Sequence, residues 1–185
     1  MLAIATDDCR LESVRLTLKT GLLPVSADDA DLLENYLLAH GIAGRSKWNE
    51  PWTFTRIFRH KGESNQLSDS QKGVLDRVNR IRREYLAVMT PWLDAVSIGA
   101  TKEGRAWASE LYDCLERNHV PETLHQWADH AEQDGATDEA QTHRQVWSDF
   151  VDLLDEFVKA LDTEQMGIRE FRETIEAGLA EFDLG

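Results

Sequence analysis

Apolar side chains recur every three or four residues through almost the whole chain, and this spacing most restricts the folds open to it. The spacing is strict near the end of the sequence, where Gly167 is followed by Ile168, Phe171, Ile175, Leu179 and Phe182. Such steps put apolar side chains on one face of an α-helix. Outside residues 51–60, no stretch shows the alternation of a half-buried strand. The pattern predicts an all-α protein, an irregular arrangement of about seven to eight helices.

Several of the expected helices have recognisable ends. Ser26 followed by Asp29 resembles a capping box, and Gly21 and Gly41 stand where helix stops are expected. Pro91 disfavours helical geometry at Thr90, so we expect one helix to end there and another to restart with Pro91 as its first residue. The expected helices cover about residues 8–20, 26–40, 68–90, 91–98, 101–115 with Thr101 as the cap, 121–135, 137–161 and 168–182.

The segment from Ile42 to Leu67 breaks the helical pattern. Read as one connection it would be a loop of 26 residues, a length that in compact proteins is usually functional. Its middle, from Trp52 to Phe58, has the composition of a strand, so a short irregular strand is an alternative. We therefore expect one long loop over about residues 42–67.

Length and composition place the chain among soluble proteins. Its 185 residues fit one domain, residues 1–185, and it has only 11 glycines and 4 prolines. The longest uncharged stretch is ten residues, against the roughly 20 apolar residues of a membrane span, and Asp7 interrupts any secretory signal. Two cysteines, Cys9 and Cys114, cannot build a disulfide framework. We expect a cytoplasmic protein without a membrane partner.

The net charge of −14 is unevenly distributed. Residues 44–84 carry 10 basic and 5 acidic side chains, a net +5, whereas residues 85–185 carry 7 and 22, a net −15. Nucleic-acid binding depends on Lys and Arg contacts with phosphates, so the whole surface is a poor DNA binder. A chain with this polarity can still present a basic strip to an anionic partner.

The basic window contains the candidate site. Its cations are interleaved with the aromatic residues Trp48, Trp52, Phe54 and Phe58, the mixture that binds single strands by charge and base stacking. The alternative is that the aromatic rings anchor the loop while the cations face water. The predicted nucleic-acid contacts are Arg45, Lys47, Trp48, Arg56 and Arg59.

The following helix could extend this surface. Arg77, Arg80, Arg82 and Arg83 all lie within seven residues of one another. Arg77 and Arg80 could instead pair with Asp76 and Glu84 on the same helix.

No motif for catalysis or metal binding is recognisable in the chain. There is no glycine-rich phosphate loop, so no ATP-binding site is recognisable. His119, His125 and His130 are six and five residues apart, unlike the ligands of helical zinc sites. Trp107, Trp127 and Trp147 lie at apolar helical positions, which favours core packing over a ligand cage. We expect no catalytic residue, no metal site and no cofactor in this chain.

Several stretches resemble the AddB family, the B subunits of bacterial ATP-dependent helicase/nucleases. They are Lys19-Thr-Gly-Leu-Leu, Asp31-Leu-Leu-Glu-Asn-Tyr-Leu-Leu-Ala-His-Gly-Ile, Gly44-Arg-Ser-Lys-Trp, Pro51-Trp-Thr-Phe, His143-Arg-Gln-Val-Trp, Leu153-Leu-Asp-Glu and Glu176-Ala-Gly-Leu. The resemblance covers essentially the whole chain but only an internal piece of the family. The uncapped end at Leu184-Gly185 fits an excised segment.

The resemblance implies a helical accessory insertion in the second RecA-like lobe of a helicase-like region that has lost motor function. For the whole family member it implies repair of DNA double-strand breaks together with the A subunit of the helicase/nuclease, ATP, magnesium and an iron–sulfur cluster. It also implies contacts with neighbouring domains of the same polypeptide and with DNA through the full complex. The alternative function is a free-standing acidic helical module that binds proteins and has no DNA role.

Overall fold

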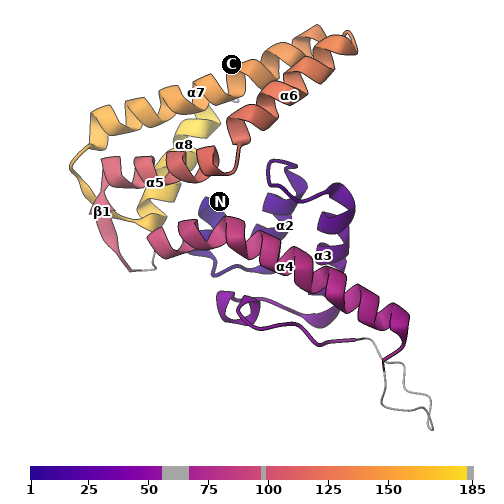
Figure 1. The fold of residues 1–185 in the computed structure, drawn as a ribbon. Coiled ribbons are helices and arrows are strands. Elements are labelled where there is room, and N and C mark those ends of the chain that lie inside the picture. The colour runs from indigo at the N-terminus through magenta and orange to yellow at the C-terminus, as the bar shows by residue number, and fades with distance from the viewer. Residues whose placement is uncertain (56–66, 97–98, 183–185) are drawn as a thin grey trace.

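The computed structural model describes residues 1–55, 67–96 and 99–182, with side chains to residue 180, and this part of the chain is built almost entirely of α-helices (Figure 1). It contains α1 (Leu2–Thr6), α2 (Leu11–Lys19), α3 (Ala27–His40), the 3₁₀ turn η1 (Arg45–Trp48), α4 (Asp69–Ala95), β1 (Thr101–Glu103), α5 (Gly104–Arg117), α6 (Val120–Gln133), α7 (Thr137–Leu161), β2 (Gln165–Gly167) and α8 (Ile168–Phe182). The predicted all-α class is confirmed.

The helices form two groups that meet near the N-terminus (Figure 1). Helices α1 to α4 and the segment after α3 make one group, and α5 to α8 make the other. Helices α6 and α7 lie antiparallel as a hairpin whose far end projects away from the first group. The groups are joined where α1 packs against α8 and α4 against α5.

The predicted helix ends are confirmed at several places. The Ser26 hydroxyl accepts the backbone N–H of Asp29 at 3.2 Å, and Gly41 ends α3 in the left-handed conformation with φ of 59°. Ser68 and Gln71 form a reciprocal capping box at the start of α4. The starts of α7 and α8 at residues 137 and 168 also match their sequence signals.

Helix α4 corrects the prediction that the chain ends one helix at Thr90 and restarts. It runs without interruption from Asp69 to Ala95, with Pro91 inside it. Pro91 is exposed, while Trp92 and Met89 are fully buried on the opposite side. Pro91 removes the N–H that the Ala87 carbonyl would accept, and Ala87 is also exposed, so water can reach this carbonyl. The buried residues on both sides of Pro91 hold the helix together.

Two short features were not predicted. Thr101 does not cap a helix but pairs with Gly167 in the antiparallel ladder of β1 and β2, and α5 begins only at Gly104. The backbone N–H of Gly104 donates to the Glu164 carbonyl at 3.0 Å, and a Cβ at Gly104 would lie 2.2 Å from the Leu161 carbonyl oxygen. A glycine is thus required where α5 meets the end of α7.

The N-terminus also differs from the expectation of one helix over residues 8–20. The chain forms α1 first, then turns through Asp8 and Cys9, both at positive φ, and begins α2 at Leu11. Of the residues that the structure describes, no helix is both long and apolar enough to cross a membrane.

Candidate nucleic-acid interface

The predicted contact residues lie in the segment that follows α3 and passes along α4. Residues 51–55 have no strand structure, and Arg56 and Arg59 lie outside the described residues, as do Phe58 and Lys61. Arg45, Lys47 and Trp48 fall together in η1. The structure therefore places three of the five predicted residues, and it places them on one turn.

Trp48 is buried between aromatic rings, at 2% exposure. Its ring centroid lies 5.0 Å from that of Tyr85 on α4 and 5.1 Å from that of Trp52. The Trp48 Nε1 has no hydrogen-bond partner among the described residues, so the ring is held by packing alone. Base stacking on Trp48 stays a prediction that requires the ring to leave this pocket.

Trp52 anchors the same segment through its backbone and its ring. Its N–H donates to the Asn79 side-chain oxygen and its carbonyl accepts from the Asn79 amide, both at 2.8 Å. The indole N–H donates to the Lys47 carbonyl at 2.8 Å, and the ring stacks on Tyr36 with centroids 5.4 Å apart. The anchor interpretation of the aromatic residues therefore holds for Trp48 and Trp52.

Phe54 differs from these two residues, because 52% of it is exposed. Its backbone carbonyl accepts the Tyr36 hydroxyl at 2.8 Å, and its ring stacks against His40 with centroids 5.7 Å apart. One face of a fixed, solvent-facing ring is the arrangement that stacking of a base needs. The sequence placed Phe54 in the basic window, but nothing in it separated Phe54 from the buried tryptophans.

Arg45 is occupied by structural contacts. Its guanidinium donates to the Leu93 carbonyl at 3.0 Å and pairs with Asp94, both at the end of α4. Its backbone N–H donates to the Asp8 carboxylate at 3.3 Å. Lys47 is exposed and has no ion pair among the described residues. Of the cations in η1, only Lys47 is thus available to a phosphate without breaking a contact.

The arginines of α4 are also largely used by the fold. Arg77 and Arg80 both bind Asp29 of α3, with Nη2 atoms 2.7 and 3.0 Å from its carboxylate oxygens. Arg80 also pairs with Glu84, as the sequence suggested, whereas the suggested pair of Arg77 with Asp76 is wrong. Because Asp29 projects from the neighbouring helix, the two arginines fasten α4 to α3.

The hydrogen bonds to Asp29 also change its acidity. Desolvation works to raise the pKa of Asp29, but the hydrogen bonds from Arg80 and Arg77 outweigh it and hold the pKa below its ordinary value. The carboxylate is therefore charged at neutral pH, and it neutralises positive charge that would otherwise face solvent.

Arg82 is a buried cation, at 5% exposure. It donates to the Trp48 carbonyl and to the Asn79 side-chain oxygen, the latter at 3.3 Å, and its guanidinium lies 5.9 Å from the centre of the Trp52 ring. Burial lowers its pKa. Arg83 is exposed and, within the described part of the chain, has no ion pair. Among the described cations of residues 44–84, Lys47 and Arg83 are therefore the ones that are exposed without an ion pair.

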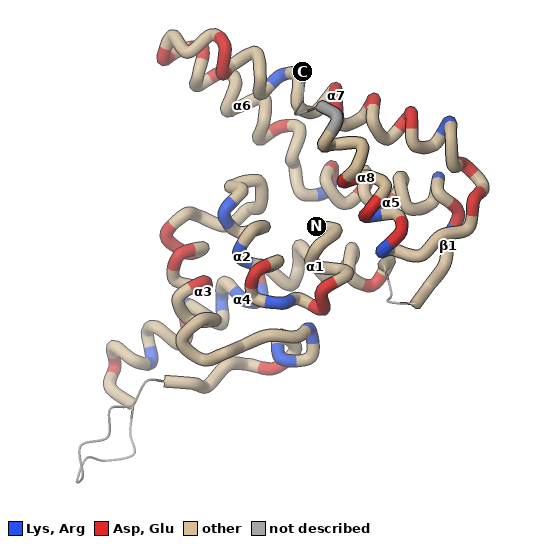
Figure 2. The backbone as a smooth tube through the Cα atoms, turned by 180° about the vertical axis from the view of Figure 1, so that it is seen from behind, with Lys and Arg blue, Asp and Glu red and all other residues tan. Residues whose placement is uncertain are grey.

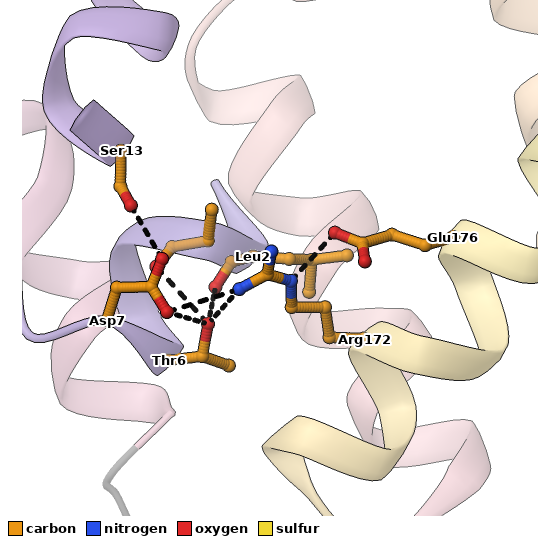
Figure 3. A network of polar contacts seen from close by, with 7 residues as sticks. Leu2, Thr6, Asp7, Ser13, Arg172 and Glu176 are labelled. Atoms are coloured by element: carbon orange, nitrogen blue, oxygen red, sulfur yellow. Dashed lines mark hydrogen bonds and ion pairs between the residues drawn. The ribbon is translucent and has the colours of Figure 1, made fainter.

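A second set of polar contacts joins the two ends of the described chain (Figure 3). Arg172 of α8 donates to the Thr6 hydroxyl at 2.5 Å, and its guanidinium lies 3.3 Å from the Asp7 carboxylate and 2.7 Å from Glu176. Ser13 donates to Asp7 at 2.8 Å, and this hydrogen bond is the largest cause of the lowered pKa of Asp7. The network stabilises the contact between α1 and α8.

Among the residues that the structure describes, no group of three or more His, Cys, Asp or Glu side chains could hold a metal ion. Trp107 is fully buried and packs against Phe171, as expected for a core residue. Trp127 and Trp147 are half-buried, in ring contact with His143 and Phe150 respectively.

The chain matches no family model, but it is similar to known proteins over nearly its whole length. It is 38% identical over 186 aligned positions to the B subunit of the ATP-dependent helicase/deoxyribonuclease of Pelotomaculum thermopropionicum, a match that covers 100% of this chain and 16% of that protein. It is 34% identical to the B subunit of Desulforamulus reducens with the same coverage, and 38% identical to that of Geobacillus thermodenitrificans, over 92% of this chain and 15% of that protein. The chain thus spans about one sixth of the length of these relatives.

Proposed function

Since the chain is homologous along its whole length to one segment of the B subunits of ATP-dependent helicase/deoxyribonucleases, we propose that it is a helical accessory part of such a protein, without catalytic residues of its own. In this role it supports the DNA path and contacts neighbouring domains and the partner A subunit while double-strand breaks are processed. The observation that carries the proposal is the match of the whole chain to about one sixth of the length of these proteins.

The chemistry of the complex belongs, on this proposal, to parts outside the chain. The ATP, magnesium and iron–sulfur cluster that the resemblance implies for the whole protein find no matching motif among these residues. We therefore place no chemical step on this chain, and its contribution is to position other parts.

We propose that DNA contact, where it occurs, uses Lys47, Phe54 and Arg83 together with Arg56 and Arg59. Lys47 and Arg83 are exposed cations without ion pairs among the described residues, and Phe54 offers an exposed ring. Arg45 and Trp48 would have to give up contacts with α4 to join them. These few contacts add to DNA contacts made by other domains.

The experiment uses the full-length protein that contains this chain, assembled with its helicase partner. Lys47→Glu combined with Arg83→Glu should weaken binding to single-stranded DNA and lower the slope of log K against log salt by about 0.7 per lost phosphate contact. Phe54→Ala should cost about 1–3 kcal/mol if a base stacks on the ring.

The matched control is Arg117→Glu combined with Arg169→Glu, because both residues are exposed and have no ion pair among the described residues. This control should change neither affinity nor slope. Unchanged affinity and slope in the Lys47 and Arg83 variant, with helicity preserved, would remove DNA contact from the proposal.

The isolated chain should bind DNA weakly or not at all. Residues 44–61 have a net charge of +4, and the rest of the chain sums to −18. Repulsion from that excess opposes phosphate binding unless other domains hold the strand.

The alternative function, an acidic protein-binding module without a DNA role, is favoured by α7, along which acidic residues recur (Figure 2). Four of them are exposed and have no ion pair among the described residues: Asp138, Asp149, Asp152 and Asp155. The length of the reading frame separates the two proposals. A frame that continues for hundreds of codons on both sides, next to a helicase gene, supports the accessory role, and a frame that closes at this length supports the module.

A further inference from the structure

An apolar groove is lined by residues of α2, of α5 and of the base of the α6–α7 hairpin. Figure 1 shows α2 below the base of this hairpin. Two adjoining cavities of about 250 and 610 Å³ share Leu22, Leu115 and Val120 in their walls. The smaller cavity adds Leu16 of α2, and the larger adds Val146 and Phe150 of α7 and Leu179 of α8. We call this surface the apolar groove.

The groove exposes side chains that normally avoid water. Leu16 is 67% exposed, Val146 44% and Leu179 42%, and they come from three different helices. Single exposed apolar residues are common on soluble proteins, but a concave cluster of apolar side chains from several helices is typical of a binding surface. Three of the six large apolar residues exposed in the described part of the chain border this one groove.

The charge that α7 brings to the edge of the groove is negative. Asp149 lines the larger cavity, and Asp152 follows one turn later; both are exposed and have no ion pair among the described residues. The two basic residues of α7 are already used, since Arg144 pairs with Glu132 and Lys159 with Glu156. The cations of α2 beside the groove, Arg15 and Lys19, both pair with Glu34 of α3.

We propose that the apolar groove is the docking site of an amphipathic helix whose apolar stripe is flanked by Lys and Arg, supplied by the remainder of the same long polypeptide. This inference rests on the proposed function, in which the chain is one part of a longer protein, because it matches only about 16% of its relatives' length. A helix laid in a groove buries apolar anchors at i, i+3, i+4 and i+7, and its flanking cations pair with Asp149 and Asp152.

Charge argues against a second copy of this chain as the occupant. A symmetric dimer through this face would bring Asp149 and Asp152 of two copies together, in a chain whose residues 85–185 already carry a net −15. Like charges placed across an interface oppose association, whereas a basic helix meets the groove with the opposite sign.

The first test uses the chain itself and a designed probe. A fluorescein-labelled helical peptide of about 18 residues, with Leu at the anchor positions and Lys on the flanks, should bind with a Kd of tens of micromolar, read by anisotropy. The same peptide with Glu in place of Lys should bind at least about 10-fold more weakly.

Matched variants then locate the binding. Val146→Asp should raise the Kd of the Lys peptide at least about 10-fold. Val74→Asp should leave this Kd unchanged, because Val74 on α4 is equally exposed at 44% but does not line the groove. Asp149→Lys combined with Asp152→Lys should reverse the preference between the two peptides. Circular dichroism confirms that each variant keeps its helices.

The second test identifies the source of the helix. A photo-crosslinking amino acid placed at position 146 of the full-length protein, in complex with its helicase partner, should crosslink within the same polypeptide to a helix flanked by Lys and Arg. Crosslinks to the helicase partner instead would overturn the assignment of the source, and equal binding of the Lys and Glu peptides would overturn the charge match.

Two further outcomes are decisive. If sedimentation shows a dimer of the chain that Val146→Asp disrupts, the groove is an interface between copies and the proposal fails. If the DNA test on Lys47 and Arg83 fails but the peptide and crosslinking results hold, only the DNA role is lost. If no crosslink forms within the polypeptide but the DNA test succeeds, the groove proposal fails and the proposed DNA role stands.

Discussion

The basic surface around α3 and α4 and the acidic hairpin of α6 and α7 use their charges in opposite ways. On α4, Arg77 and Arg80 hold Asp29 and Arg82 is buried beneath the η1 turn. On the hairpin, Asp138, Asp149 and Asp152 are exposed and have no ion pair among the described residues. The first region uses its charges in contacts within its own fold, whereas the hairpin leaves these three carboxylates open to solvent or a partner.

The difference shows that the net charge of a sequence window is not the charge that it offers to a partner. Residues 44–84 have a net +5, yet among the described cations of this window only Lys47 and Arg83 are exposed and unpaired. Arg45 pairs with Asp94 at the end of α4, and Arg77 and Arg80 pair with Asp29 of α3. Of the two that remain, Lys72 pairs with Asp69 and Arg82 is buried. A basic window can therefore be chiefly a structural feature.

Trp52→Ala should have the largest effect on the basic side of this comparison. The substitution leaves a cavity between Tyr36 and Trp48 in place of the buried ring. The free energy of unfolding, measured in urea, should therefore fall by about 3–5 kcal/mol. Phe54→Ala is the control, and because its ring is half exposed the loss should stay below about 1.5 kcal/mol. Equal losses would mean that the two aromatic residues do not differ in role.

Asp29→Asn should have the second largest effect, because Arg77 and Arg80 lose their shared carboxylate. The free energy of unfolding, measured in urea, should fall by about 1–3 kcal/mol. Asp152→Asn is the control on the acidic side and should cause no loss of stability. A destabilised Asp152→Asn variant would show that the carboxylates of the hairpin also stabilise the fold.

Acid should destabilise the chain in part through the same carboxylates. The folded-state pKa values of Asp29 and Asp7 are lowered, so their stabilisation is complete above the unfolded pKa of about 3.9 and is lost as pH falls through the lower folded pKa. The free energy of unfolding, measured in urea between pH 6 and pH 2.5, should fall as the pH is lowered. In Asp29→Asn this fall should be shallower. An unchanged slope in that variant would exclude Asp29 as a source of the acid sensitivity.

Neutralising the hairpin should have the smallest effect. Asp149→Asn combined with Asp152→Asn should raise Tm slightly at low salt, because repulsion among unpaired acids is relieved, and the gain should vanish in about 1 M salt, where the Debye length is about 3 Å. Neutralising Glu34, which binds Arg15 and Lys19, should instead lower Tm. Opposite signs for these two changes would support the comparison directly.

The sequence alone determined the all-α class, most of the helices and the family resemblance. Apolar spacing predicted the bounds of α3, α7 and α8 nearly to the residue, and in α3 the Ser26 cap added to it, because both signals depend on neighbours within one or two helical turns. The same local reading expected a break at Pro91, and it missed β1 and β2, whose three-residue strands are too short to show alternation.

Only the tertiary structure decided which residues of the basic window remain free. The sequence named Arg45, Lys47 and Trp48 with equal weight, but the partners that occupy Arg45 and Trp48 lie on α4, and Arg77 binds Asp29 across 48 positions. The apolar groove likewise joins side chains of α2, α5, α7 and α8 that no periodicity links. Helical spacing specifies which face of a helix is apolar, whereas the partner that covers or leaves open that face is set by long-range packing.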